Sequence, residues 1–125
     1  MPDTLDSLSQ QVREFAQARE WGQFHSPKNL ASALIVEAGE LLEHFQWMTE
    51  EQSRRLAPEK LEEVGSEIAD VLLYLIQLSN VLGIDPVKAA QAKIEVNGRK
   101  YPVELAKGRN AKYDRDRVDG PDRLK

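Results

Sequence analysis

Apolar residues recur at helical spacing along most of this 125-residue chain, and this periodicity is the feature that most limits its fold. No segment shows the sustained alternation of apolar and polar residues that is typical of a half-buried strand. The sequence therefore predicts an all-α protein, in which four long helices pack as a bundle. The expected helices cover residues 4–20, 26–46, 59–82 and 86 to about 100, with one further helical turn within residues 49–56.

Proline and glycine mark the expected boundaries of these helices. Ser26 followed by Pro27 suits an N-cap and a first helical residue, because serine can accept from an unpaired amide while proline has no amide to satisfy. The same cap-then-proline pair recurs at residues 85–86. Gly83 can end the third long helix, and Pro102 must end or kink the fourth.

The composition limits the classes of function. The chain has no cysteine, which excludes a disulfide framework, a thiolate zinc site and a cysteine nucleophile. No apolar run approaches the roughly 20 residues of a membrane span, and the opening stretch MPDTLDSLSQ lacks the regions of a signal peptide. We therefore expect no membrane partner and a cytoplasmic location. The acidic net charge of -4 argues against a nucleic acid polymer as partner.

The C-terminal segment has the opposite charge. Residues 107–125 carry seven Lys or Arg against four Asp, a net charge of +3. This segment either meets a small polyanion or is a solvated terminus. Because the apolar positions run out after Gly108, we expect one domain over residues 1–113 and a flexible tail over residues 114–125.

Two pairs of carboxylates accompany the two most apolar helices. Glu37 and Glu40 stand three residues apart in the second long helix, and Glu67 and Asp70 do so in the third. Projected at about 100° per residue, both pairs fall on the flank of the expected core stripe at the same angle. Neither pair has Lys or Arg at i+4, so intrahelical ion pairs do not explain them. The expected core stripes are Leu34, Ala38, Leu41, Leu42 and Phe45 in the second helix, and Val64, Ile68, Val71, Leu72, Leu75, Ser79 and Leu82 in the third.

Such carboxylates have two interpretations. The simpler one is that both pairs are solvated acids on exposed helix faces. If they gather, four carboxylates without cationic partners repel one another and resist ionisation unless a cation joins them. Oxygen ligands in a chain without cysteine favour hard divalent metals such as Mg²⁺ or Mn²⁺. A di-iron bundle would need Glu-x-x-His, which this chain lacks.

The E-x-x-E and E-x-x-D pairs, separated by 26 residues, resemble the signature of the MazG-like all-α nucleoside triphosphate pyrophosphohydrolases. The stretches REWGQFHSPKNL, GELLEHFQW, DVLLYLIQL and KIEVNGRKYP look like the dCTP-hydrolysing branch of this family, in the same order and over about residues 5–113. The resemblance implies a MazG-like helical bundle that splits the α–β phosphoanhydride of a nucleoside triphosphate. It implies dCTP or a modified dCTP as substrate, and monophosphate and pyrophosphate as products.

The same resemblance implies roles for individual residues. Glu37, Glu40, Glu67 and Asp70 match the magnesium ligands of the family. The positions that match its nucleotide-contacting residues are Trp21, Trp47, Tyr74, Lys93 and Asn97. Similar proteins assemble as homotetramers, built as dimers of dimers, with sites near subunit contacts.

The chemistry of a triphosphate fits these residue types. Because the substrate is polyanionic, four carboxylates can serve it only through the metal. Attack by water at the α-phosphorus needs a base, for which we expect Glu37. The basic positions that could hold the outer phosphates are Lys93, Lys100, Lys107, Arg109 and Lys112.

Several of these side chains have an alternative interpretation. Trp21 and Trp47 could be core or interface residues instead of base-stacking ones. His25 could contact the nucleotide, as we expect, or merely cap a helix. His44 stands one turn past Glu40, but we expect it to be a neighbour rather than a ligand because magnesium prefers oxygen. The alternative function is a non-catalytic helical bundle that binds a nucleotide or a partner.

Overall fold

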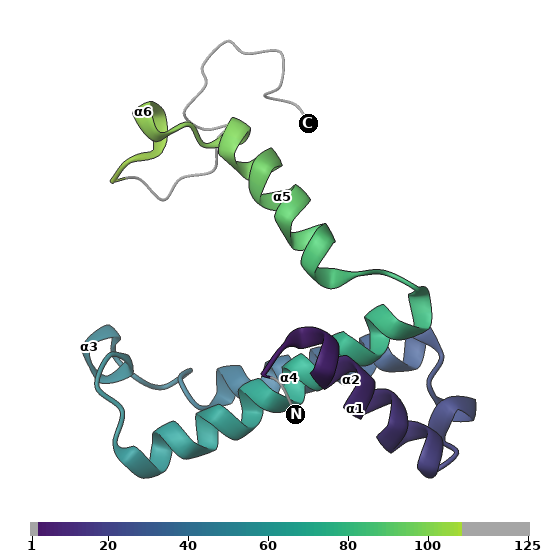
Figure 1. The fold of residues 1–125 in the computed structure, drawn as a ribbon. Coiled ribbons are helices and arrows are strands. Elements are labelled where there is room, and N and C mark those ends of the chain that lie inside the picture. Colours follow the sequence, from purple (N-terminus) through teal and green to yellow (C-terminus); the bar gives the residue numbers. More distant parts are fainter. Residues whose placement is uncertain (1–2, 109–125) are drawn as a thin grey trace. The chain divides into compact units, whose positions relative to one another are not determined.

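In a computed structural model of the chain, residues 3–108 are described, and they form helices joined by short connections, with no strand among them (Figure 1). The elements are α1 (Leu5–Ala18), the 3-10 helix η1 (Trp21–Phe24), α2 (Pro27–Glu43), α3 (Glu50–Ser53), α4 (Pro58–Leu82), α5 (Pro86–Lys100) and α6 (Val103–Ala106). The all-α fold class is confirmed, and each of the four expected long helices is present. The expected domain boundary at residue 113 and the tail over residues 114–125 lie outside the described residues.

Local chemistry sets the ends of the long helices as the sequence predicted. The Ser26 hydroxyl caps α2 by accepting from the backbone N–H of Asn29 at 3.1 Å. Gly83 ends α4 in the left-handed conformation, with φ of 68°, which glycine adopts without a steric penalty. The N–H of Ile84 then donates to the carbonyl of Ser79 at 2.9 Å, which satisfies one of the last carbonyls of the helix.

Two helices end earlier than expected. α1 ends at Ala18 because Glu20 adopts a left-handed backbone, with φ of 55°, which cannot continue a right-handed helix. α2 ends at Glu43 instead of residue 46, and the residues that follow form a series of turns. Both differences are of the two or three residues over which helix ends commonly vary.

The chain divides into two units, Met1–Asp85 and Pro86–Lys125, which are described separately. In the first unit, α2 and α4 lie side by side and make the main packing contact, and α1 packs against α4 and η1 (Figure 1). α2 and α4 are antiparallel, because His44 at the end of α2 meets Lys60 at the start of α4. The second unit begins with α5.

The core of the first unit is small. Leu30 and Ile76 are the most deeply buried apolar residues, with 1% and 2% of their surface exposed, and Val12 and Val64 are also buried. Ser79 is the buried polar residue of this core, and its hydroxyl donates to the Leu75 carbonyl at 2.9 Å. Each of α1, α2 and α4 therefore contributes at least one buried side chain to this unit.

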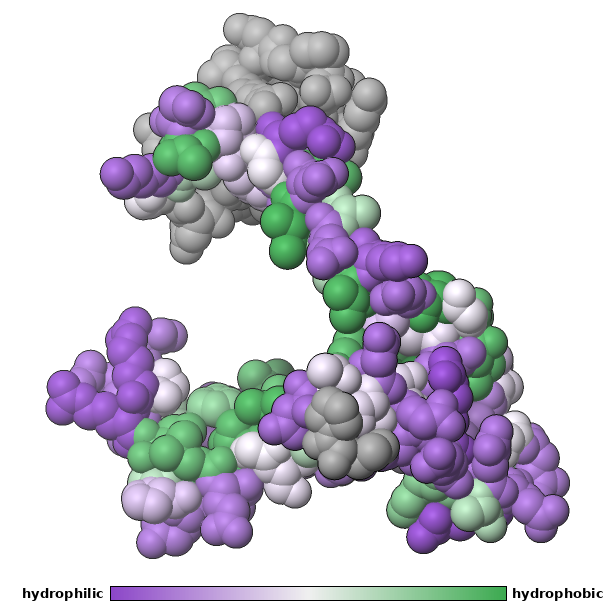
Figure 2. Space-filling view, viewed as in Figure 1, coloured by the Kyte–Doolittle hydropathy of each residue, from purple (hydrophilic) through white to green (hydrophobic). Residues whose placement is uncertain are grey.

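The expected core stripes were partly wrong. Leu42 and Ile68, which stood within those stripes, have 61% and 51% of their surface exposed. α4 meets α2 through its carboxylate flank, where Glu67 lies, and meets α1 through another side, where Asn80 accepts from Ser9 at 2.7 Å. Within the stripe around Ile68, Val64 and Ser79 are buried, whereas Ile68 itself stays exposed. Green surface in Figure 2 marks such apolar residues on the viewed face.

Within residues 3–108, no single helix is both long and apolar enough to cross a membrane. By length and composition, α4 and α5 would be sufficient only if they were counted together across the break between them.

Candidate metal centre

Three carboxylates converge between α2 and α4. Glu37, Glu67 and Asp70 each offer one oxygen, and these oxygens lie within 4.8 Å of one another. Glu37 comes from α2, while Glu67 and Asp70 come from one turn of α4, so the antiparallel pairing of the two helices brings them together. Three of the four acids in the E-x-x-E and E-x-x-D pairs thus form one group.

The two glutamates of this group are incompletely satisfied. Glu37 and Glu67 each have one buried carboxylate oxygen, Oε2, without a hydrogen-bond partner. The Glu67 carboxyl, and then burial, raise the pKa of Glu37, although Glu40 opposes this effect in part. A buried polar oxygen without a partner is costly, and so are adjacent carboxylates of like charge. A divalent cation with oxygen ligands would relieve both costs, so the donor set fits a hard metal ion.

Glu40 stands beside the group of three. Its side chain is exposed and contributes no oxygen to the close set. The Glu37 carboxyl nevertheless raises the pKa of Glu40, so the two groups interact within α2. Glu40 lies one turn further along the helix, where it extends the acidic line toward His44.

An aromatic recess adjoins the carboxylates. It has a volume of about 160 Å³, and its lining residues are Trp21, His25, Asp70, Leu73, Tyr74 and Gln77. Asp70 belongs to both the carboxylate group and this lining, so the recess and the metal candidate are continuous. The volume is below the roughly 300 Å³ at which pockets for drug-sized ligands begin, so the single chain encloses only part of a nucleotide.

Two ring contacts position Trp21. Its ring lies edge-on to Phe15 with centroids 5.7 Å apart, and to His25 with centroids 6.2 Å apart. The guanidinium of Arg19 in turn lies 3.5 Å from the centre of the Phe15 ring. The turn at Glu20 lets the chain fold back in this way, so that Trp21 and His25 enter one recess from the short helix η1 and its end.

Other expected site residues lie elsewhere. Trp47 follows the end of α2 and has 89% of its surface exposed. Lys93 and Asn97 stand four residues apart on one face of α5, in the second unit, and are therefore not placed relative to the carboxylates. Of the expected basic positions, Lys100 and Lys107 also belong to that unit, whereas Arg109 and Lys112 lie outside the described residues.

Two polar residues near the site were not predicted from the sequence. Gln77 lines the aromatic recess, and its Oε1 is buried without a hydrogen-bond partner. Lys60 contacts His44 at 3.2 Å, which gives that ring a partner other than the carboxylate group. Both residues stand seven positions from a motif acid of α4, Gln77 after Asp70 and Lys60 before Glu67. Seven residues are about two helical turns, so this spacing could have revealed both.

Comparisons with known proteins give consistent results. The model of the MazG-like family matches residues 33–115. The chain is 38% identical to dCTP pyrophosphatase 1 of Homo sapiens and 39% identical to that of Mus musculus, in each case over 112 residues and 88% of this chain. It spans 66% of the length of each of these curated relatives. A pyrophosphatase from Archaeoglobus fulgidus, known from a crystal structure, is 41% identical in sequence to this chain. The two structures superpose with a TM-score of 0.67 over 82% of this chain and 95% of that one.

Proposed function

The chain belongs to the MazG-like family, whose model matches well over half of its residues, and from this we propose that it is a nucleoside triphosphate pyrophosphohydrolase. The proposed reaction is the hydrolysis of the α–β phosphoanhydride, which yields a nucleoside monophosphate and pyrophosphate. The names of the curated relatives and of the archaeal pyrophosphatase support this activity. The dCTP named in the curated relatives supports dCTP or a modified dCTP as substrate, and hence a role in clearing the nucleotide pool.

One observation carries the proposal most directly. The buried Oε2 atoms of Glu37 and Glu67 have no hydrogen-bond partner and stand in a group with Asp70. Carboxylates alone would repel a triphosphate, so this group can serve such a substrate only with a cation between them. We propose Mg²⁺ as that cation, with Mn²⁺ able to replace it, because both are hard ions that take oxygen ligands.

Glu37, Glu67 and Asp70 would hold the cation, and Glu40 would join them from the next turn of α2. When bound, the cation would neutralise the charge of the triphosphate and polarise the phosphoryl group. Glu40 already interacts with Glu37 and stands one turn away on the same helix, which supports its place in the proposed set.

We assign the role of general base to Glu37. A carboxylate that would touch both the cation and the attacking water is the simplest base, and Glu37 is one of the three in the close group. Glu37 would take a proton from a water molecule as the water oxygen bonds to the α-phosphorus. The bond between that phosphorus and the bridging oxygen would break, and the bridging oxygen would leave with the pyrophosphate.

The aromatic recess would receive the nucleoside. Trp21 and Tyr74 would contact the base, and His25 would contact the base or the α-phosphate from the same recess. Trp47, Lys93 and Asn97 complete the proposed set of substrate contacts. Since the recess encloses only part of a nucleotide, these three would contribute from the rest of the assembly.

We further propose that the chain assembles as a homotetramer. Large apolar side chains stay exposed in the single chain, and Ile35, Leu61, Ile68 and Ile94 each have more than half of their surface open. Soluble monomers rarely leave so many apolar side chains uncovered, and burying them against further copies would remove this surface from water. Sedimentation velocity measures the assembly directly. A chain that stays monomeric at micromolar concentrations would contradict this part of the proposal.

Release of pyrophosphate from a panel of nucleoside triphosphates tests the proposed activity. The panel should include the canonical deoxynucleotides and 5-modified dCTP, each with Mg²⁺ and with EDTA. We expect pyrophosphate to be released with Mg²⁺ and not with EDTA. The highest kcat/KM should be that for dCTP or a modified dCTP. No release from any triphosphate would leave the non-catalytic binding bundle as the function.

A further inference from the structure

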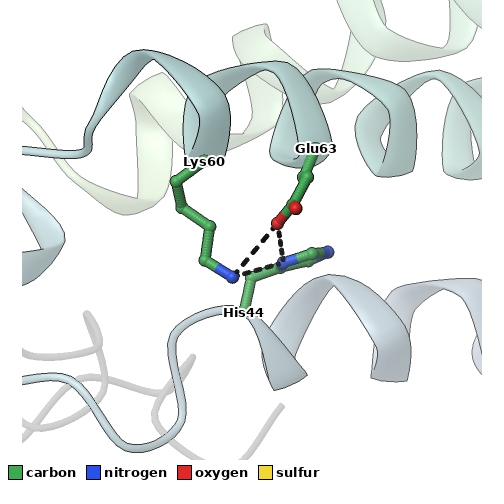
Figure 3. A network of polar contacts seen from close by, with 3 residues as sticks. All are labelled: His44, Lys60 and Glu63. Carbon is green, nitrogen blue, oxygen red and sulfur yellow. Dashed lines mark hydrogen bonds and ion pairs between the residues drawn. The ribbon is translucent and has the colours of Figure 1, made fainter.

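A second polar cluster joins α2 and α4 beyond the carboxylates (Figure 3). Lys60 Nζ lies 3.2 Å from His44 Nδ1 and 3.4 Å from Glu63 Oε2, and the last two atoms are 4.0 Å apart. An ammonium group only donates, so the imidazole nitrogen accepts from Lys60 in the tautomer that carries its proton on Nε2. His44 comes from the end of α2, whereas Lys60 and Glu63 come from the first two turns of α4.

This cluster stands one helical turn from Glu67 on α4, and one turn from Glu40, which lies beside the group of three, on α2. His44 follows Glu40 by four residues, and Glu63 precedes Glu67 by four, which is the spacing of neighbours along one helix face. Lys60 precedes Glu67 by seven residues, or about two turns, so it shares the face of α4 that carries the carboxylates.

The face of α4 therefore has a defined order. The recess with Tyr74 lies toward the C-terminal end, Asp70 and Glu67 follow, and Lys60 stands at the N-terminal end. Lys60 and Glu67 are separated by about 10 Å along the helix axis, at 1.5 Å per residue. The Lys60 side chain reaches along the helix in that direction, because its Nζ contacts Glu63 three residues further on. The C-terminal end of this face thus suits an aromatic base, and its N-terminal end suits an anion.

We propose that Lys60 binds the outer phosphates of the substrate, and so the pyrophosphate that is released. This inference rests on the proposed function and gives the substrate one direction along α4, with its base toward Tyr74 and its terminal phosphate toward Lys60. An ammonium has three donors, and the described contacts take two of them, which leaves one for a phosphate oxygen. Glu63 is 60% exposed, so it can yield its place to a phosphate.

A purely structural role for Lys60 makes a different prediction. If the cluster only holds α2 against α4, loss of the charge of Lys60 or of Glu63 weakens this contact between the helices. Both losses then change pyrophosphate binding in the same direction. If Lys60 binds phosphate, Glu63 competes with the phosphate for the same ammonium. Removal of Lys60 then weakens pyrophosphate binding, whereas removal of the Glu63 charge strengthens it.

Isothermal titration of magnesium pyrophosphate, with excess Mg²⁺, into the full chain tests this assignment without any turnover. We expect Lys60→Gln to bind about tenfold more weakly or worse, because it loses a charge-assisted hydrogen bond. Glu63→Gln should bind about two- to fivefold more tightly, as suits removal of an exposed ion pair. Lys28→Gln is the matched control, since Lys28 lies on the opposite side of α2 from Glu37, and it should bind as the wild type does.

The outcomes separate this inference from the proposed activity. If Lys60→Gln binds magnesium pyrophosphate as tightly as the wild type, or if the wild type does not bind it, the assignment is wrong even where triphosphates are hydrolysed. If no triphosphate is hydrolysed, the activity is wrong, but a selective loss in Lys60→Gln still supports the anion site. Should Lys60→Gln fail to fold, the sign of the Glu63→Gln change decides, and weaker binding there overturns the proposal.

Discussion

Glu37 on α2 and Glu67 on α4 face each other across the helix pair, and each keeps one buried carboxylate oxygen that lacks a hydrogen-bond partner. The Glu67 carboxyl raises the pKa of Glu37, as expected when like charges approach one another out of water. The pair is therefore a source of instability in the metal-free protein and a source of affinity for a cation. The first two predictions concern these two consequences.

The metal-free protein should gain stability from Glu37 as the pH falls. The pKa of Glu37 is raised in the folded state above its ordinary value of 4.5, so the folded protein binds this proton more tightly than the unfolded chain does. The stability that protonated Glu37 contributes is hence lost as the pH rises above the raised pKa, and it is recovered as the pH falls through that pKa. Glu37→Gln should melt at a higher temperature than the wild type at about pH 7 in EDTA. This difference in melting temperature should narrow as the pH falls toward the ordinary pKa. A difference that does not change with pH would show that the pKa is not raised.

Added Mg²⁺ or Mn²⁺ should raise the melting temperature of the wild type, and EDTA should reverse the rise. A ligand that binds only the folded state at 100 times its Kd stabilises by about 2.7 kcal/mol. Glu67→Gln should lose most of this gain in melting temperature, because it removes one negative charge from the group of three carboxylates. Thermal melts followed by circular dichroism check this prediction, and an equal gain in wild type and variant would place the metal elsewhere.

Glu40→Gln and Asp70→Asn should abolish turnover while the helical circular dichroism stays nearly unchanged. Loss of a hydrogen-bond partner behind a metal ligand costs about 10- to 100-fold, and loss of a ligand itself should cost at least as much. Glu62→Gln is a matched control, because Glu62 is an exposed acid of α4 outside the carboxylate group. Full activity in either test variant would remove that residue from the metal centre.

Trp21→Ala should lower kcat/KM for the preferred triphosphate by about five- to 150-fold, the range that corresponds to the 1 to 3 kcal/mol of one base–aromatic contact. Phe24→Ala is the control in the same short helix, since Phe24 is 61% exposed and lines neither the recess nor the carboxylate group. Steady-state kinetics at saturating Mg²⁺ measures both variants. Equal effects in the two would mean that Trp21 acts through the fold and not through the base.

Leu30→Ala should destabilise the protein by about 2 to 5 kcal/mol, because it removes a fully buried side chain and leaves a cavity. Leu30 is 1% exposed, whereas Leu42 on the same helix is 61% exposed. Leu42→Ala should therefore cost less at the same protein concentration. Urea unfolding measures both, and a larger cost at Leu42 would restore the core stripe that the sequence suggested.

The sequence was sufficient for the class of fold and for most helix starts. The Ser26 cap and the left-handed Gly83 depend on interactions within a few residues, and local chemistry of this kind is visible in the sequence. The early end of α1 was not visible, because nothing in the residue type of Glu20 favours the left-handed backbone that it adopts.

The packing face of α4 could not be predicted with the same certainty. This helix carries apolar residues around more than half of its circumference, so periodicity marks a broad stripe without saying which part of it meets α2. The carboxylate flank proved to be part of the contact, and of the stripe around Ile68 only Val64 and Ser79 are buried. The equal angles of the two acid pairs left open whether the flanks would meet, and Glu37 does lie with Glu67 and Asp70.

Every carboxylate of the candidate centre comes from one helical hairpin, within Pro27–Leu82. Contacts between helices that are neighbours in sequence have low contact order, and such contacts form rapidly during folding. A ribosome also completes this hairpin before it has made α5, and domains generally fold as their segments emerge. The carboxylates of the candidate centre can therefore come together within one continuous stretch of the chain, without any contribution from α5.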